Sequence, residues 1–123
     1  ISEHVMSELE RCKSWIESAL EHSGGTHNFD DICEGVKEGR MQLWPGKDGC
    51  VITELVSYPR IKTINVFLGA GKLDQLTDMH ESVIAWAKLN GAKKLTMSGR
   101  FGWERALKKH GWKFLQTTMY KEF

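Results

Sequence analysis

The stretch Gly69-Ala70-Gly71-Lys72 is one place where residue types and spacing suggest chemistry. It follows an apolar run over residues 64–68 and precedes a segment with helical spacing. A helix N-terminus has unpaired N–H groups and a dipole that favours anions, and glycines let a phosphate approach the backbone closely. We therefore expect a phosphate or pyrophosphate here, although the spacing is not that of a Walker A loop. An ordinary strand-to-helix turn is the alternative.

A second candidate is Arg100, in the loop Gly99-Arg100-Phe101-Gly102-Trp103. The backbone of a glycine-rich loop does not need an arginine, and a guanidinium there could clamp a phosphate or carboxylate through two hydrogen bonds. Pairing with Glu104 is the alternative. Trp103, and Trp44 beside Pro45-Gly46, are the tryptophans that we expect to line a cleft, whereas the other three are expected in the core.

The candidate base is Glu54, which interrupts the apolar run over residues 50–57. An amine nucleophile must lose a proton before it attacks, and a carboxylate can take that proton directly or through water. The alternative is that Glu54 points outward from an edge strand. We expect His80 at the surface or an interface, and His110 at a helix C-terminus, where a cation complements the dipole. No His, Cys, Asp or Glu set has metal-ligand spacing, so no metal is expected.

Length and composition favour one globular domain spanning residues 1–123, with 41% hydrophobic and 27% charged residues. The three cysteines, Cys12, Cys33 and Cys50, form no CxxC pair and predict free thiols in a reducing cytoplasm. No apolar run approaches the roughly 18 residues that a membrane helix needs. We expect a soluble cytoplasmic protein that does not bind membranes.

The net charge of +1 hides a strong asymmetry. Residues 1–54 carry 5 basic and 11 acidic side chains, whereas residues 88–123 carry 9 basic and 2 acidic ones. A basic face can bind nucleic acid, but the chain has no recognised reader motif. A solvated face, or the rim of an anion site, is the preferred interpretation, and nucleic acid is not expected as a partner.

The elements that position these residues begin with two helices in residues 1–40. Ser2 is expected to cap the first, which ends at Gly24-Gly25, and Thr26 or Asn28 to cap the second. Residues 41–44, 50–57 and 61–68 have strand patterns separated by turn residues. They predict a three-stranded antiparallel meander.

The remainder predicts a long helix over residues 72–90, a strand over 93–97, a short helix over 103–110 and a last strand over 112–122. The order is ααβββαβαβ. Antiparallel strands followed by a βαβ crossover predict an α/β (mixed α+β) domain. Its sheet should be mixed and mostly antiparallel, with helices on both faces.

Several motifs resemble the GNAT superfamily of acyl-CoA N-acyltransferases: Leu43-Trp44-Pro45-Gly46, Trp86-Ala87-Lys88-Leu89-Asn90-Gly91, Gly99-Arg100-Phe101-Gly102-Trp103 and Lys109-His110-Gly111-Trp112. The resemblance covers about residues 41–122. It is strongest to the short GNAT-like proteins encoded by bacteriophages and prophages.

This resemblance implies acetyl-CoA as co-substrate, bound where two strands splay apart, and an amine on a small molecule or a protein as acceptor. Glu54 would act as a base through water. The residues that it implies for binding the cofactor are Leu68, Gly69, Ala70, Gly71, Lys72, Leu73, Arg100 and Trp103.

Two positions differ from the family pattern. Leu107 stands where the family often has a tyrosine that protonates the departing thiolate, and Val66 stands where its loop has Gln or Arg. The alternative is therefore a catalytically inactive GNAT-fold binding module of a phage or prophage, in the host cytoplasm or associated with the virion.

Overall fold

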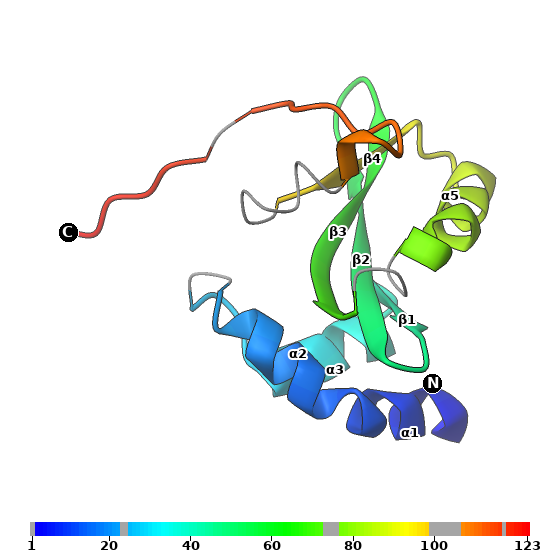
Figure 1. Cartoon of the computed structure of the whole chain (residues 1–123), viewed down its shortest axis with the longest axis vertical. Helices are drawn as coiled ribbons and strands as arrows, with labels where there is room; N and C mark the ends of the chain where they lie inside the picture. Colours follow the sequence, from blue (N-terminus) through cyan, green and yellow to red (C-terminus); the bar gives the residue numbers. More distant parts are fainter. Residues whose placement is uncertain (1, 23–24, 73–76, 99–106, 117) are drawn as a thin grey trace.

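The computed structural model describes residues 2–22, 25–72, 77–98, 107–116 and 118–123, and it has a mixed α+β fold (Figure 1). The helices are α1 (Glu3–Arg11), α2 (Lys13–Leu20), α3 (Phe29–Lys37) and α5 (His80–Leu89). The strands are β1 (Met41–Pro45), β2 (Gly49–Ser57), β3 (Lys62–Gly71) and β4 (Lys94–Met97). They form one sheet in the order β1-β2-β3-β4, antiparallel except that β4 runs parallel to β3.

The N-terminal helices begin where their capping residues predict. The Ser2 side chain accepts a hydrogen bond from the Val5 amide, and Asn28 forms a reciprocal capping box with Asp31. The single first helix expected up to Gly24-Gly25 is wrong, because α1 ends at Arg11 and α2 begins at Lys13. Cys12 is the junction, and its side chain is fully buried.

The predicted meander is confirmed, and its strands are longer than expected. The turn between β1 and β2 is held to α1 by the Arg11 guanidinium, which donates to the carbonyl oxygens of Gly46 at 2.7 Å and Lys47 at 3.3 Å. The crossover from β3 through α5 to β4 is also as predicted, but the helix expected over residues 72–90 does not begin at Lys72, and α5 spans His80–Leu89. The N-terminal helices and α5 thus lie on opposite faces of the sheet.

The pairing of β2 with β3 contains a β-bulge. Ile52 pairs with Leu68 and Thr53 pairs with Val66, so Phe67 has no partner in the register of β2. A bulge of this kind places two successive side chains on the same side of a strand and bends the strand. Phe67 and Leu68 accordingly both pack toward α1–α3.

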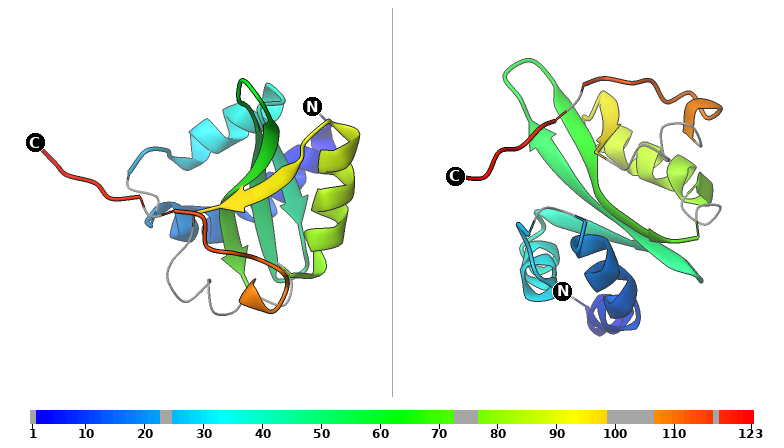
Figure 2. Two further views of the ribbon diagram at one scale, coloured as in Figure 1. Left: turned by 90° about the horizontal axis from the view of Figure 1, so that it is seen from above. Right: turned by 60° about the vertical axis from the view of Figure 1, so that its left-hand side comes forward.

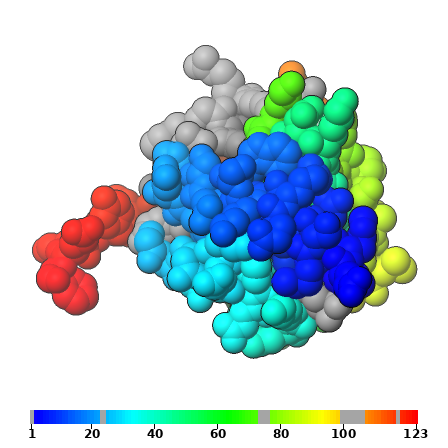
Figure 3. Space-filling model, turned by 90° about the horizontal axis from the view of Figure 1, so that it is seen from below, coloured from blue at the N-terminus to red at the C-terminus, as the bar shows by residue number. Residues whose placement is uncertain are grey.

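The sheet separates two hydrophobic clusters, and the second view in Figure 2 shows the layers. One face is covered by α1, α2 and α3, and its strand residues include Met41, Ile52 and Leu68. The other face is covered by α5, which packs Val83 and Ala87 against Ile64. Figure 3 shows that residues of the N-terminal helices make up most of the face seen from below.

The final part of the chain differs from the prediction. The last strand, expected over residues 112–122, is absent from the described residues 112–116 and 118–122, which have no regular secondary structure. Most of the short helix expected over 103–110 lies outside the described residues, and only 107–108 are seen as helical. None of the helices in the described part of the chain is long and apolar enough to cross a membrane.

Gly71 ends β3 at a close crossing with the β1–β2 hairpin. Its φ is +99°, and a Cβ atom there would collide with the Asp48 carbonyl oxygen and the Gly49 Cα. Gly39 also has a positive φ, +79°, but a Cβ atom would meet nothing within 4 Å. Substituting each glycine in turn therefore distinguishes the cost of backbone strain, which is present at both positions, from the cost of a steric clash, which is present at Gly71 alone.

We expect Gly39→Ala to lower the free energy of unfolding by about 1–2 kcal/mol, the cost of a left-handed alanine. Gly71→Ala should lose roughly 1–3 kcal/mol more, because the clash forces the hairpin to shift. Urea denaturation of both variants measures this difference. Equal losses would show that the crossing is not tightly packed.

Burial raises the pKa of the Cys50 thiol from its usual value of 9.0 to about 12. In the unfolded chain this thiol loses its proton first, so the unfolded state binds fewer protons and stability falls as pH rises from about 9 to about 12. The slope is at most about 1.4 kcal/mol per pH unit. Wild type should therefore lose stability with pH more steeply than Cys50→Ala, measured by urea denaturation at each pH. Identical slopes would contradict this assignment.

Candidate functional site

The bulge coincides with the place where β3 leaves β4. The register of β4 covers only Thr63–Val66 of β3, and the last pair is Val66 with Met97. Phe67 follows at once, and β3 then continues to Gly71 beside β2 alone. Among the described residues, no strand lies on the other side of residues 67–71, so this length of main chain is open.

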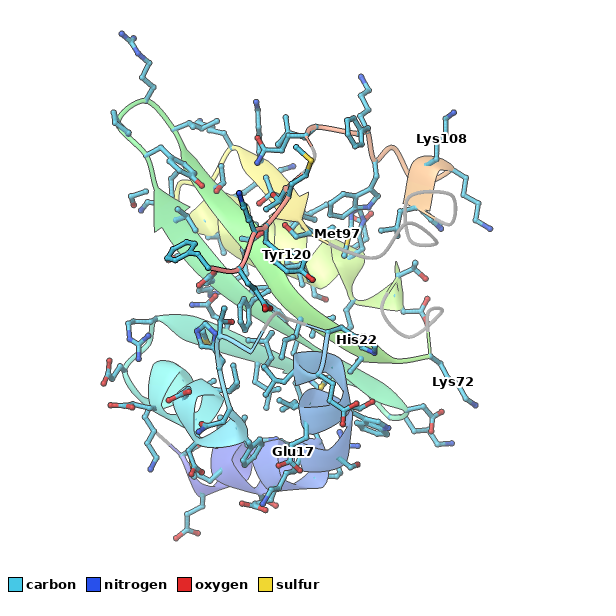
Figure 4. The ribbon with its side chains drawn as sticks, turned by 90° about the vertical axis from the view of Figure 1, so that its left-hand side faces the viewer. Glu17, His22, Lys72, Met97, Lys108 and Tyr120 are labelled. Carbon is cyan, nitrogen blue, oxygen red and sulfur yellow. The ribbon has the colours of Figure 1, made fainter. Side chains whose placement is uncertain are left out.

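A pocket lies beside this open length, on the face of the sheet that α5 covers. Its empty volume is about 560 Å³, which includes the open solvent at its mouth. Most of its wall is apolar. The lining residues are Val51, Val66, Gly69, Thr77, Met79, His80, Val83, Leu95, Met97, Leu107, His110 and Trp112. Met97, labelled in Figure 4, is on the β4 side.

Two histidines supply most of the polar chemistry of this pocket. His80 is the first residue of α5 and half-buried, and its ring centroid lies 5.8 Å from that of Trp112. His110 is exposed and lies at the mouth. Apolar walls with a few polar groups are typical of small-molecule sites.

On the opposite face, a row of three polar side chains crosses the sheet. Asn65 of β3 donates a hydrogen bond to Glu54 Oε1 of β2 at 3.2 Å, and Thr96 Oγ1 of β4 donates to Asn65 Oδ1 at 3.0 Å. All three are half-buried. Met41 of β1 pairs with Glu54 and packs in the core under α1–α3. The row therefore lies on the face of the sheet that these helices cover.

The row and the pocket therefore lie on the two sides of one sheet. Asn65 pairs with Thr96 one step before the last β3–β4 pair, Val66 with Met97. Beyond that pair β3 and β4 no longer lie side by side. A ligand that reached this end from the pocket would be close to both the polar row and the open main chain of β3.

The predicted cofactor residues lie in several places. Leu68, Gly69, Ala70 and Gly71 all belong to β3, and Gly69 lines the pocket. Leu73, Arg100 and Trp103 lie outside the described residues. Glu54 is on β2 in the polar row, and it does not point outward from an edge, because β2 is flanked by β1 and β3.

The expectation that Gly69-Ala70-Gly71 forms the turn opening a helix is wrong. The three residues pair with Val51, Cys50 and Gly49, so the hairpin holds them in the strand. The Lys72 amide donates to the Asp48 carbonyl oxygen at 3.1 Å, which extends the same hairpin. The Lys72 side chain is exposed and projects from the end of the strand (Figure 4).

Sequence reasoning missed the site roles of His80, Asn65 and Thr96. A usable signal existed for His80, because it shares a helical stripe with Val83 and Ala87 at steps of three and four residues. The polar row of Glu54, Asn65 and Thr96 had no such signal, because only the pairing register of three strands brings these residues together. Trp44, predicted to line a cleft, instead packs edge-on against Trp86 with centroids 6.0 Å apart.

No group of three or more His, Cys, Asp or Glu side chains in the described part of the chain could hold a metal ion. Cations do lie near the mouth of the pocket. Lys108 and Lys109 are exposed on the short segment that carries Leu107 and His110 (Figure 4 labels Lys108). They could meet the phosphates of a ligand without being needed for the fold.

No protein-family model matches the sequence, and no curated protein matches it. Two solved structures have a similar fold, the wild type and a single-residue mutant of the Thermus thermophilus protein TTHA1254. Their TM-scores are 0.62 and 0.63, at 15% sequence identity, over 100% of this chain and 93% of theirs. This similarity shows that the fold recurs in another protein, and at such identity it shows nothing more.

Proposed function

We propose that this chain is a GNAT-like N-acyltransferase that moves an acetyl group from acetyl-CoA to an amine. The observation that carries the proposal is the apolar pocket beside the open length of β3, residues 67–71. An enzyme of this kind needs a site for a long ligand arm that ends where a base can act. The pocket lies on one face of the sheet and the polar row on the other, and both lie at or next to the last β3–β4 pair, Val66 with Met97.

The pantetheine arm of CoA contains two amides in a flexible, mostly apolar chain. Main-chain groups along residues 67–71 can pair with such amides as a neighbouring strand would, since no strand lies there among the described residues. The walls supplied by Val66, Met97 and Val83 would cover the methylene groups. The pyrophosphate would lie toward Lys72 and the region of Arg100, as the resemblance implies.

Glu54 would accept the proton of the attacking amine through water. The amine nitrogen then bonds to the thioester carbon, the C–S bond breaks, and CoA leaves with the bonding electrons on sulfur. The hydrogen bond from Asn65, itself held by Thr96, fixes one carboxylate oxygen of Glu54. The other oxygen can then face the acceptor on the side of the sheet that carries α1–α3.

A second candidate function is binding without catalysis. Leu107 is buried in the wall of the pocket, at the position where the family often has a proton-donating tyrosine. A leucine cannot donate a proton, which favours an inactive GNAT-fold module, such as a phage or prophage protein that only binds its ligand. Acyl transfer is the measurement that separates the two candidates.

Acetyl-CoA binding is the first test. Isothermal titration calorimetry should detect binding of acetyl-CoA to the full chain. Met97→Trp, which fills the pocket, should weaken it at least about tenfold, or about 1.4 kcal/mol. Leu89→Trp is the matched control, because Leu89 is 87% exposed on α5, and it should keep the wild-type affinity. No heat at millimolar acetyl-CoA, or equal affinity in all three proteins, would exclude this site.

Glu54→Gln tests the base. The glutamine can still accept the Asn65 hydrogen bond, so the fold and the acetyl-CoA affinity should be unchanged. Transfer to a panel of primary amines, followed by mass spectrometry of the acetylated products, should slow by about 10²–10⁴-fold. Glu17→Gln, at an exposed position of α2, is the control. Acetyl-CoA binding without product from any amine would support the second candidate, and an unchanged rate in Glu54→Gln would remove Glu54 as the base.

A further inference from the structure

The end of the chain is an apolar segment without a partner strand among the described residues. After Trp112, the described residues 113–116 and 118–123 have no regular secondary structure and run away from the body of the molecule (Figures 1 and 2). We call residues 113–123 the tail. Its large apolar side chains are mostly exposed: Phe114 64%, Leu115 69%, Met119 87%, Tyr120 88% and Phe123 completely.

The composition of the tail is that of a strand. It contains no glycine or proline, and it is rich in aromatic and β-branched residues, which favour extended pairing. An extended segment of this kind is ordered as a strand only beside another strand, which pairs its N–H and C=O groups and covers its apolar side chains. The tail is therefore suited to a sheet edge.

The sheet offers a matching edge at β4. Its only strand partner among the described residues is β3, so the outer side of Lys94–Met97 is open. The other edge, β1, is less suitable, because Pro45 has no N–H to donate and α1 and α3 pack against that strand. An open edge of this kind is a ready template for a strand from another chain.

The start of the tail lies beside the first residue of α5. The Trp112 ring lies against His80 at the beginning of α5, with centroids 5.8 Å apart. From there the described residues of the tail form no ladder with β4 of their own molecule, and in the space-filling view the red end of the chain stands clear of the body (Figure 3). A second copy placed in its path would present the same open edge.

We propose that two copies of this chain exchange their tails, each adding residues 113–123 as a strand to the outer edge of β4 in the other. The arrangement is a two-fold, self-complementary interface, the commonest kind in homodimers. Each sheet would gain a fifth strand beside Leu95 and Met97, which line the pocket. The proposal does not depend on the proposed function.

The area that the two tails would bury and the net charge of the chain are both compatible with a stable dimer. Three aromatic side chains per tail, at about 150–250 Å² each, would bury roughly 900–1,500 Å² in two tails before any other contact. A specific interface buries about 1,200–2,000 Å². The net charge of +1 gives little repulsion between copies, and the acidic N-terminal half of one copy can face the basic C-terminal half of the other.

The mass of the full chain in solution tests the exchange. Size-exclusion chromatography with light scattering should give twice 14.0 kDa at high micromolar concentration, and a chain ending at Trp112 should behave as a monomer. The double variant Phe114→Asp/Tyr120→Asp should also be monomeric. Its control, Lys113→Ala/Lys121→Ala, keeps the apolar side chains and should remain dimeric. Circular dichroism of each variant checks that the body is folded.

Hydrogen exchange then identifies the edge that the tail occupies. Amides of the tail and of Lys94–Met97 should be protected together in the dimer, and both should lose protection in the double variant. A monomeric full chain whose tail is protected would mean that the tail folds onto its own β4, which overturns the proposal. A dimer that survives the truncation, or a tail that exchanges like an unfolded peptide, overturns it equally.

Discussion

One extra residue in β3 distorts the sheet beside the candidate site. Ile52 and Thr53 are consecutive on β2, yet their partners Leu68 and Val66 are separated by Phe67. Before the bulge, β3 has a strand on each side. After it, β3 continues with β2 alone, and its pairing with β4 has already ended. The bulge therefore lies at the start of the open main chain, next to the pocket.

The bulge is stabilised from both faces. Phe67 and Leu68 fill the cluster under α1–α3, and the Phe67 ring also meets the edge of His27, with centroids 4.7 Å apart. On the other face Thr53 is completely buried, accepts a hydrogen bond from Trp44 Nε1 at 2.9 Å and donates to Gln42 Oε1 at 2.9 Å. Burying these polar groups is tolerable only because each is paired. The distortion is therefore a fixed part of the fold and not a weak point in it.

Local patterns predict the elements, and long-range pairing decides the site. The caps at Ser2 and Asn28, the meander and the βα crossover all depend on short stretches of sequence, and all are confirmed. The bulge has no local signal, because Phe67 is as good a strand residue as its neighbours. The row from Glu54 to Thr96 joins residues 42 positions apart, and only the register brings them together.

The composition of the tail predicts a strand, and its described residues form none. Residues 113–123 carry the side chains of a strand, and their described part reaches no edge in its own molecule. A single sequence indicates that a segment can form a strand, but it does not show which sheet edge that segment can reach. The same limit explains why Gly69-Ala70-Gly71 has the local pattern of a turn and yet lies in a strand: its partners at residues 49–51 are distant in the sequence.

Packing in the fold explains the residue types at some positions of the site but not at others. Val66, Val83 and Leu107 are apolar and buried, so packing alone accounts for their residue types. Glu54 and Asn65 are different, because they are polar, half-buried and joined by a hydrogen bond, and apolar packing does not account for them. The proposed function would require a reaction near Glu54. The leucine at position 107 does not exclude one, because a thiol with a pKa near about 8.5 can leave as a thiolate near neutral pH without a proton donor. The lack of a donor would slow the release of CoA and leave the attack of the amine, and the need for a base, unchanged.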